Sequence, residues 1–286
     1  MGPDKDSPEN GAKRRPRAVS AKEIFGERAG RYEELDVFSQ EKYYQPLIDF
    51  AGPRPDDRVL DLATGTGLLA LLLARRAKEV TGSDVTPEML ERAVDRAKKG
   101  GQENIRFVEA EASSLPFPDA SFDLVVCRTA FHHFPEPKKA LTEIYRVLGP
   151  GGRLVLADVV GAYGPGQDRA AREYLEKLID PSHVLAYTEG EFTAMLEEAG
   201  FNVEQSQVPE SKALPVEIIL GLEKIEDFDL KTEITSFLNV HANTDLGGLE
   251  ITESGGRFVL TWPLIFIAAA KEYKILKGAL GTSHSM

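Results

Sequence analysis

The chain has 286 residues, 42% hydrophobic and 28% charged, which is ordinary globular composition with ample length for a buried core. Its net charge of −12 excludes a broad cationic surface for nucleic acid or anionic lipid and favours a small neutral or cationic substrate. Cys127 is the single cysteine, so no internal disulfide or cysteine pair for metal or redox chemistry can form. We therefore expect a reducing, cytoplasmic setting.

No N-terminal apolar segment precedes the first charged residues, and the longest apolar run, Trp262 to Ala270, is too short to span a bilayer. Residues 1–20 are rich in proline, glycine, serine and charge and predict a disordered tail, whose basic cluster fits a solvated segment better than a nucleic-acid arm. From Ser20 to Phe50, apolar residues at spacings of three and four predict helices. Aromatic residues there could cover a substrate pocket, and Tyr32 is our candidate for a residue that contacts the substrate.

The stretch from Val59 to Gly67 reads as a short strand followed by a glycine turn and by the apolar run that opens a helix. Glycines allow a ligand to approach the backbone closely, and the helix start offers N–H groups to a small anionic group. Asp61, at the strand end, would attract an ammonium group and repel a pyrophosphate. S-adenosylmethionine carries an ammonium, a carboxylate and a sulfonium without a phosphate, so this charge pattern favours it over a dinucleotide.

A second strand, Val80 to Asp84, ends in an acid whose carboxylate can accept both ribose hydroxyls of either cofactor. Thr86 and Pro87 then read as the N-cap and first position of a helix. The same patterning predicts strands over Ile105–Val108, Phe122–Cys127, Leu154–Val160 and Phe201–Val208, and helices over Pro137–Leu148, Gln167–Ile179 and Glu189–Ala199. This alternation predicts an α/β fold with a mainly parallel sheet covered on both faces.

Residues 210–256 carry the weakest pattern, which we interpret as helical from Val216 to Asn239 with a glycine-rich loop over 247–256. Phe258 to Ala270 reads as extended, broken into two pieces by Pro263. We expect a single domain over residues 21–275, with a cofactor-binding core over 55–160 and a lid and substrate region over 161–256. Residues 276–286 are expected to be a flexible tail.

Six segments in the right order carry a family resemblance: Val59–Gly67, Gly82–Leu90, Glu111–Phe117, Ser121–Val126, His132–Phe134 and Arg146–Leu156. In these, the chain resembles the S-adenosylmethionine-dependent methyltransferases with a Rossmann-like fold, in the small-molecule group related to quinone and sterol methyltransferases. The resemblance implies a doubly wound sheet with N-terminal helices and a helical lid before the last strand. It continues loosely from Asp180 to Val208, where Asp180, Pro181, Ser182 and His183 look like a later segment of the group.

The resemblance also implies the cofactor contacts. The methionine end would be held by the turn residues Asp61, Gly65, Thr66 and Gly67, the ribose by Asp84 beside Val85, and the adenine edge by Glu111 with Ala112. The group commonly has Asp-Ala at the adenine edge, and Glu111 lengthens the reach there. Arg128 falls where the family's chain passes the methionine portion of the cofactor.

His132, His133 and Asp158 are the candidate catalytic residues, each weighed against a packing role. If the stretch around the histidines is extended, they point to opposite faces and do not form a metal pair. Methyl transfer from a sulfonium is an in-line displacement that requires alignment and no metal. A base is needed only where the acceptor arrives protonated, as a phenol or an activated carbon does.

Two other classes remain open from the sequence. An NAD-dependent oxidoreductase is favoured by Gly65-x-Gly67-x-x-Ala70 and Asp84, but does not account for Asp61. A non-catalytic cofactor-binding or scaffold protein would keep the same motifs. Within the methyltransferases, the N-terminal signature of the quinone enzymes is not found before Val59, and arsenic methylation needs several cysteines. The expected partner is a small-molecule methyl acceptor at O, N or C, with the oligomeric state open.

Overall fold

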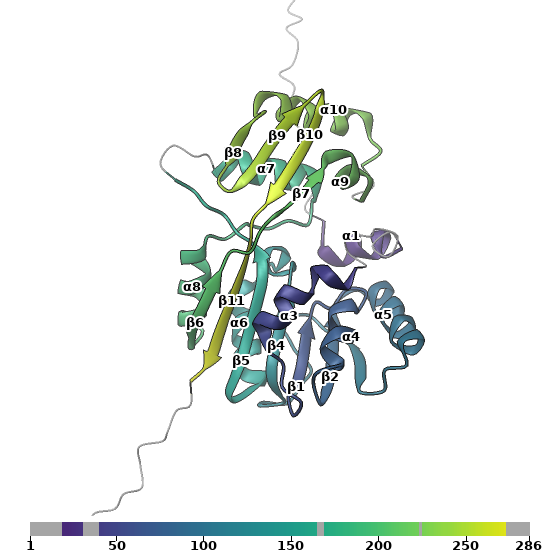
Figure 1. Cartoon of the computed structure of the whole chain (residues 1–286), viewed down its shortest axis with the longest axis vertical. Helices are drawn as coiled ribbons and strands as arrows, with labels where there is room; N and C mark the ends of the chain where they lie inside the picture. Colours follow the sequence, from purple (N-terminus) through teal and green to yellow (C-terminus); the bar gives the residue numbers. More distant parts are fainter. Residues whose placement is uncertain (1–18, 31–39, 165–168, 223–224, 273–286) are drawn as a thin grey trace, which may run out of the picture.

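A computed structural model describes residues 19–30, 40–164, 169–222 and 225–272, which contain a seven-stranded central sheet (Figure 1). Its strands are β1 (Arg58–Leu62), β2 (Glu79–Asp84), β3 (Ile105–Glu109), β4 (Phe122–Arg128), β5 (Leu148–Val159), β6 (Phe201–Gln207) and β11 (Leu264–Lys271). They lie in the order β3-β2-β1-β4-β5-β11-β6. The first five strands in that order are parallel, whereas β11 is antiparallel to both β5 and β6.

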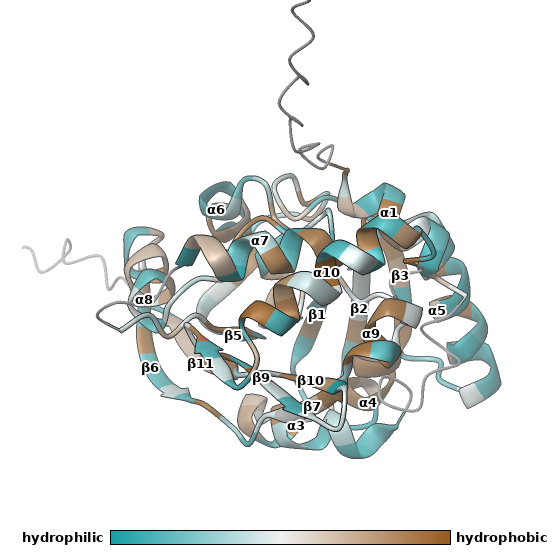
Figure 2. Ribbon diagram, turned by 90° about the horizontal axis from the view of Figure 1, so that it is seen from above, coloured by the Kyte–Doolittle hydropathy of each residue, from teal (hydrophilic) through white to brown (hydrophobic). Residues whose placement is uncertain are grey.

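Helices cover both faces of this sheet, as the view from above shows (Figure 2). The covering helices are α3 (Gln45–Ala51), α4 (Leu68–Ala74), α5 (Pro87–Gly100), α6 (Pro137–Val147) and α8 (Glu189–Glu198). The same part of the chain also holds α1 (Ala21–Arg28) and the 3-10 turns η1 (Glu41–Tyr43) and η2 (Phe131–His133). Leu60 and Leu62 point to one face of β1 and pack with α6 and α8, whereas Val59 points to the other face and packs with α3 and α4. This alternation follows from the two-residue period of a strand.

A second unit, here called the cap, consists of α7 (Arg169–Ile179) and residues 212–222 and 225–262. It holds β7 (Lys212–Pro215), α9 (Val216–Leu222), α10 (Phe228–Val240), β8 (Thr244–Leu246), β9 (Leu249–Ser254) and β10 (Arg257–Trp262). The four strands form an antiparallel sheet in the order β7-β10-β9-β8, and the cap has its own apolar core. It lies beyond the carboxyl ends of the parallel strands, where ligands of open α/β sheets bind (Figure 1).

Most predicted elements are confirmed, including the break at Pro263, although the two pieces beside it belong to different sheets. One expectation was wrong. Residues 216–239 form two helices, and residues 244–254 form a strand pair and not a loop, so the insert before the last strand is not purely helical. Tyr32 and the two predicted tails beyond residues 19 and 272 lie outside the described residues.

Candidate active site

Asp61 is a buried carboxylate at the carboxyl end of β1. It is 1% exposed, and Thr64 Oγ1 donates a hydrogen bond to its Oδ2 at 2.5 Å. The pKa of Asp61 is raised to about 7: burial is the largest cause and the nearby Asp84 adds to it, while the Thr64 hydroxyl and Arg128 only partly oppose the rise. A cation bound here would remove the penalty, so this site fits an ammonium group.

The two glycines of the turn have different tasks. Gly65 has φ +55°, and a Cβ built on it meets nothing within 4 Å, so this part of the turn lies open. Gly67 has φ +79°, and a Cβ there would lie 2.7 Å from the Cβ of Ala93 on α5. Gly65 therefore leaves room for a ligand at the backbone, while Gly67 permits the close packing of the turn against α5.

Asp84 ends β2 beside the same turn. Its Oδ2 accepts a hydrogen bond from Gly65 N at 2.8 Å, and its Oδ1 accepts one from Thr86 N at 2.9 Å. Each oxygen keeps a second lone pair for a ribose hydroxyl. Thr86 occupies the N-cap of α5, but its own hydroxyl makes no capping bond and has no partner among the described residues. The half-buried Val85 lies between these two residues.

The predicted adenine edge lies next to this acid. Ala110 N donates a hydrogen bond to the Asp84 carbonyl oxygen at 2.9 Å, which joins the loop after β3 to the end of β2. Glu111 is exposed and pairs with Ser114 in an isolated β-bridge, and Ala112 is half-buried. The structure thus brings Asp61, Asp84 and the Glu111 loop to one edge of the sheet.

Arg128, the last residue of β4, lies on the other side of Asp61. Its guanidinium stacks over the Tyr44 ring at 4.4 Å from the centroid, which fixes the side chain. The next residue, Thr129, has φ +45°, and Ala63 at the end of the neighbouring strand has φ +56°. A β-branched residue in the left-handed region is strained, and such strain concentrates at functional sites.

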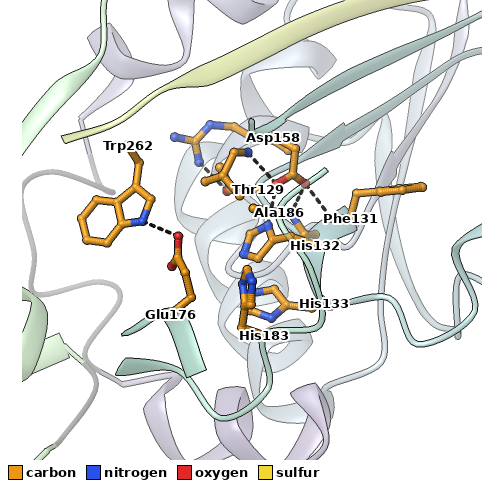
Figure 3. Close-up of polar contacts among 12 residues, drawn as sticks. Thr129, Phe131, His132, His133, Asp158, Glu176, His183, Ala186 and Trp262 are labelled. Atoms are coloured by element: carbon orange, nitrogen blue, oxygen red, sulfur yellow. Dashed lines mark hydrogen bonds and ion pairs between the residues drawn. The ribbon is translucent and has the colours of Figure 1, made fainter. Parts of the chain in front are cut away.

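The histidines lie beyond this strained residue (Figure 3). His132 Nδ1 and Asp158 Oδ1 are 2.5 Å apart. Asp158 Oδ2 accepts hydrogen bonds from Ala130 N at 3.1 Å and Phe131 N at 2.7 Å. Burial alone would raise the pKa of Asp158, but the ion pair and hydrogen bond with His132 outweigh it and lower that pKa. Asp158 is therefore an ionised carboxylate that orients His132, and not a free base.

The two adjacent histidines do not point to opposite faces, because the segment is a 3-10 turn and not extended. Their ring centroids are 3.9 Å apart with a tilt of 44°, and His183 lies 5.6 Å from His132. Burial lowers the pKa of His133 to about 3, with a contribution from the charge of His132. Burial also opposes protonation of His132, but Asp158 prevails and raises its pKa. Within the described residues, no three His, Cys, Asp or Glu side chains are arranged to hold a metal ion.

Helix α1 borders the site and connects its two ends. Lys22 Nζ pairs with Glu109 Oε1 of β3 at 2.7 Å, and the Phe25 ring meets His133 edge-on at 5.1 Å. Between α1 and the first turn of α5 lies an open pocket of about 640 Å³. None of Asp61, Gly65 and Asp84 lines that pocket, which is therefore separate from the glycine turn.

Sequence reasoning missed the residues of α7 and of the loop after it that contact the histidines. Ser182 Oγ lies 3.1 Å from His133 Nδ1 and donates to Asp180 Oδ1 at 2.6 Å. His183 Nε2 lies 2.9 Å from Glu173 Oε2. The family-like segment from Asp180 to His183 was the available signal, but only the fold shows that it packs on the first two histidines.

Comparison with known proteins agrees with this geometry. Residues 60–156 match the family model described as methyltransferase domain. The uncharacterized methyltransferase YcgJ of Bacillus subtilis is 40% identical over 171 residues, which cover 60% of this chain and 67% of that protein. The demethylmenaquinone methyltransferase of Thermus thermophilus is 44% identical over 151 residues, covering 49% of this chain and 68% of that protein.

Solved structures extend the similarity to nearly the whole fold. The crystal structure of YcgJ from Bacillus subtilis superposes with a TM-score of 0.73 at 32% identity, over 82% of this chain and 99% of that one. The crystal structure of a putative methyltransferase from Bacillus halodurans superposes with a TM-score of 0.73 at 29% identity, over 81% of this chain and 99% of that one. No helix in the described part of the chain is long and apolar enough to cross a membrane.

The chain therefore belongs to the S-adenosylmethionine-dependent methyltransferases of the type 11 group. It is an enzyme that transfers a methyl group to a small-molecule acceptor. This family membership decides against the NAD-dependent oxidoreductase. The position of Asp61, whose carboxylate would repel a pyrophosphate, agrees with it.

Proposed function

We propose that S-adenosylmethionine binds along the edge formed by the ends of β1, β2 and β3. The observation that carries this proposal is the buried Asp61 carboxylate at the turn, whose pKa is raised to about 7 by burial and by the charge of Asp84, so that a bound cation would stabilise its ionised form. Asp61 would hold the ammonium group, the open backbone at Gly65 and Thr66 would border the methionine end, and Gly67 would keep the turn closed on α5. Arg128 would face the carboxylate of the methionine portion.

The other end of the cofactor would lie along β2 and β3. Asp84 would accept the ribose hydroxyls through its remaining lone pairs, with Val85 beside the sugar. Ala112 would border the adenine, and Glu111 could reach the edge of the base. When bound, S-adenosylmethionine supplies an electrophilic methyl group and leaves as a neutral thioether, so the protein mainly aligns the acceptor and excludes water.

The acceptor would lie between the sheet edge and the cap, beside His132 and His133. Because Asp158 holds His132 through Nδ1, the Nε2 atom of His132 is the ring nitrogen left to take a proton from an acceptor. His133 would form the neighbouring polar wall. Relatives named for methyl transfer to demethylmenaquinone, to 27-O-demethylrifamycin SV and to arsenite show that proteins similar to this one act on different acceptors.

We also propose that the enzyme works in a reducing compartment such as the cytoplasm. What supports this is the cysteine usage: Cys127 is the single cysteine of the sequence, so no internal disulfide contributes to the fold. A cofactor-binding protein without catalysis is the second candidate, since the same turn and acids would serve it.

The experiment that tests the cofactor is calorimetric titration of the purified chain with S-adenosylmethionine, S-adenosylhomocysteine and NAD. Binding of the first two without NAD supports the proposal, and binding of NAD alone would overturn it. Binding without turnover of any amine, phenol or carbon acceptor would favour the non-catalytic candidate.

A further inference from the structure

The loop that carries the proposed adenine edge runs from the end of β3 to Leu115 and is fixed at both ends. Its start is the Ala110 amide, which is bound to the end of β2. Within it, Ser114 N donates to the Glu111 carbonyl oxygen at 3.0 Å, which closes the turn around Ala112. Leu115, directly after it, is 5% exposed and packs in the core. The loop is thus short and lies between two fixed points.

Two side chains of α6 hold the second fixed point through its backbone. Glu143 Oε2 accepts a hydrogen bond from Leu115 N at 2.8 Å, and Arg146 Nη2 donates to the Leu115 carbonyl oxygen at 2.9 Å. Arg146 Nη1 donates to the Phe117 carbonyl oxygen at 2.7 Å and to Asp119 Oδ1 at 2.9 Å. One helix therefore binds both backbone groups of Leu115 and the carbonyl oxygen two positions later.

The same two side chains also bind each other, in the bidentate geometry typical of arginine and carboxylate. Arg146 Nε and Nη2 lie 2.9 Å and 2.8 Å from Glu143 Oε1 and Oε2. Arg146 is the main cause that lowers the pKa of Glu143, so this carboxylate is ionised. A guanidinium has five N–H donors, and the five hydrogen bonds of Arg146 use all of them. A lysine, with one ammonium group, could not reach these acceptors together.

Apolar packing already fixes the side chains of this segment. Leu115 and Phe117 belong to the core, where the Phe117 ring meets the Phe122 ring edge-on at 5.1 Å. The Arg146 side chain is 30% exposed, and an ion pair in such a position contributes about 1 kcal/mol or less to stability. Because the pair adds little to the stability of the fold and binds three backbone groups, its main effect is on the conformation of the loop.

We propose that Glu143 and Arg146 are positioning residues for the adenine of the cofactor: they act through the loop, which they hold so that Glu111 and Ala112 meet the edge of the base. This inference rests on the proposed binding of S-adenosylmethionine at this edge of the sheet. The Glu111 carboxylate would accept a hydrogen bond from the amino group of adenine. Because the loop is ordered before the cofactor arrives, binding does not carry the cost of ordering it. Loss of the pair should therefore weaken the contact with the base.

Calorimetric titration of the full chain with S-adenosylhomocysteine and S-inosylhomocysteine tests this role. The two probes differ only in the base, where hypoxanthine has a carbonyl oxygen in place of the amino group of adenine. We expect the unmodified chain to prefer S-adenosylhomocysteine by about tenfold or more, and Arg146→Lys and Arg146→Met to reduce this preference to about threefold or less. Arg146→Lys is the sharper variant, since it keeps the charge and loses the planar fork. An unchanged preference in both variants would overturn the proposal.

Arg58→Met is the matched control. Arg58 Nε and Nη2 pair with Asp123 at 3.0 Å and 2.9 Å, and the two side chains are 36% and 37% exposed, but the pair lies at the amino ends of β1 and β4. We expect this variant to lower the melting temperature about as much as Arg146→Met and to keep the preference for adenine. An equal loss of preference in the control, or an equal loss of affinity for both probes in the Arg146 variants, would mean that the pair acts through general stability and would overturn the proposal.

Two results on the unmodified chain separate this inference from the function on which it rests. Equal binding of the two probes would show that the loop does not recognise the base, and would overturn the positioning role while leaving the cofactor site in place. Failure of S-adenosylhomocysteine itself to bind would instead overturn the proposed function.

Discussion

Asp61 and Asp84 end neighbouring parallel strands and bind the same turn from two sides: Asp61 through the Thr64 hydroxyl at 2.5 Å, Asp84 through the Gly65 amide at 2.8 Å. Two buried carboxylates so close raise each other's cost of ionisation, and the charge of Asp84 contributes to the raised pKa of Asp61. The turn is thus built around negative charge that a cationic ligand would neutralise.

Replacing Asp61 by Asn should stabilise the free protein while abolishing cofactor binding. The pKa of Asp61 is about 7 in the folded chain against 3.8 in the unfolded one, so the folded state holds the extra proton and loses stability as pH rises from about 4 to about 7. Asp61→Asn removes this penalty and should raise the free energy of unfolding at pH 8 by about 1–3 kcal/mol, with a smaller gain at pH 5. Urea unfolding at both values measures this, and Asp123→Asn, at the amino end of β4, is the control. A less stable Asp61→Asn protein at pH 8 would contradict the account.

Cofactor binding should release protons near neutral pH. At pH 7 about half of the Asp61 carboxyls in the free protein carry a proton, and an ammonium group bound beside them should drive it off. Calorimetry with S-adenosylhomocysteine in two buffers of different ionisation enthalpy should show a release of about half a proton at pH 7 and almost none at pH 8.5. Identical apparent enthalpies in both buffers at pH 7 would remove Asp61 from the ammonium site.

Replacing Asp84 should act on both the turn and the ligand. Asp84→Ala removes the acceptor for Gly65 N and Thr86 N together with the proposed ribose contact, and should weaken S-adenosylhomocysteine binding by roughly 2 kcal/mol or more. Asp84→Asn keeps one acceptor oxygen and should lose less. The measurement is the dissociation constant of S-adenosylhomocysteine beside that of homocysteine, which lacks the ribose. If both ligands lose affinity equally, Asp84 acts only through the turn.

The Asp158–His132 pair should make stability fall as pH rises. The pKa of His132 is raised in the folded protein, so its contribution is fully present below about pH 6.5 and is lost as pH rises through the higher folded value. The difference in unfolding free energy between the unmodified chain and His132→Gln should therefore be larger at pH 6 than at pH 9. A pH-independent difference would indicate that His132 is neutral throughout, and His241→Gln provides the comparison.

Arg172 should be the main tie between the cap and the core sheet. It is 0% exposed, and its Nη1 donates to the carbonyl oxygens of Val160 at 2.9 Å and Gly247 at 2.6 Å. Arg172→Met removes both of these hydrogen bonds and the buried pair with Glu176, although Gly247 O keeps Ala162 N as a donor at 2.8 Å, and should cost about 3 kcal/mol in unfolding free energy. Arg169→Met, on the same helix, removes a partly exposed pair with Glu191 and should cost about 1 kcal/mol or less. Equal losses would show that the buried contacts add little.

The part of the fold from β1 to β5 could be predicted because each local pattern there indicates a single type of element. A strand, a glycine turn and an apolar helix follow one another around Asp61, and the acid at the end of β2 marks the next strand. The cap could not be predicted, since β8, β9 and β10 pair with each other and with β7 across up to fifty residues, and their short strands carry little periodicity. The histidine site could be predicted only in part. The sequence indicated His132, His133 and Asp158, but the contact of Ser182 with His133 joins residues 49 positions apart, and local patterns do not reveal such contacts.

The last strand of the fold, β11, lies between β5 and β6 in the interior of the sheet. During synthesis, the apolar edge of β5 therefore lacks this partner until residues 264–271 have left the ribosome, long after the glycine turn of residues 63–67 has emerged. An open, apolar strand edge pairs readily with other chains. A nascent chain that pauses before Leu264 consequently exposes this edge to pairing with other chains.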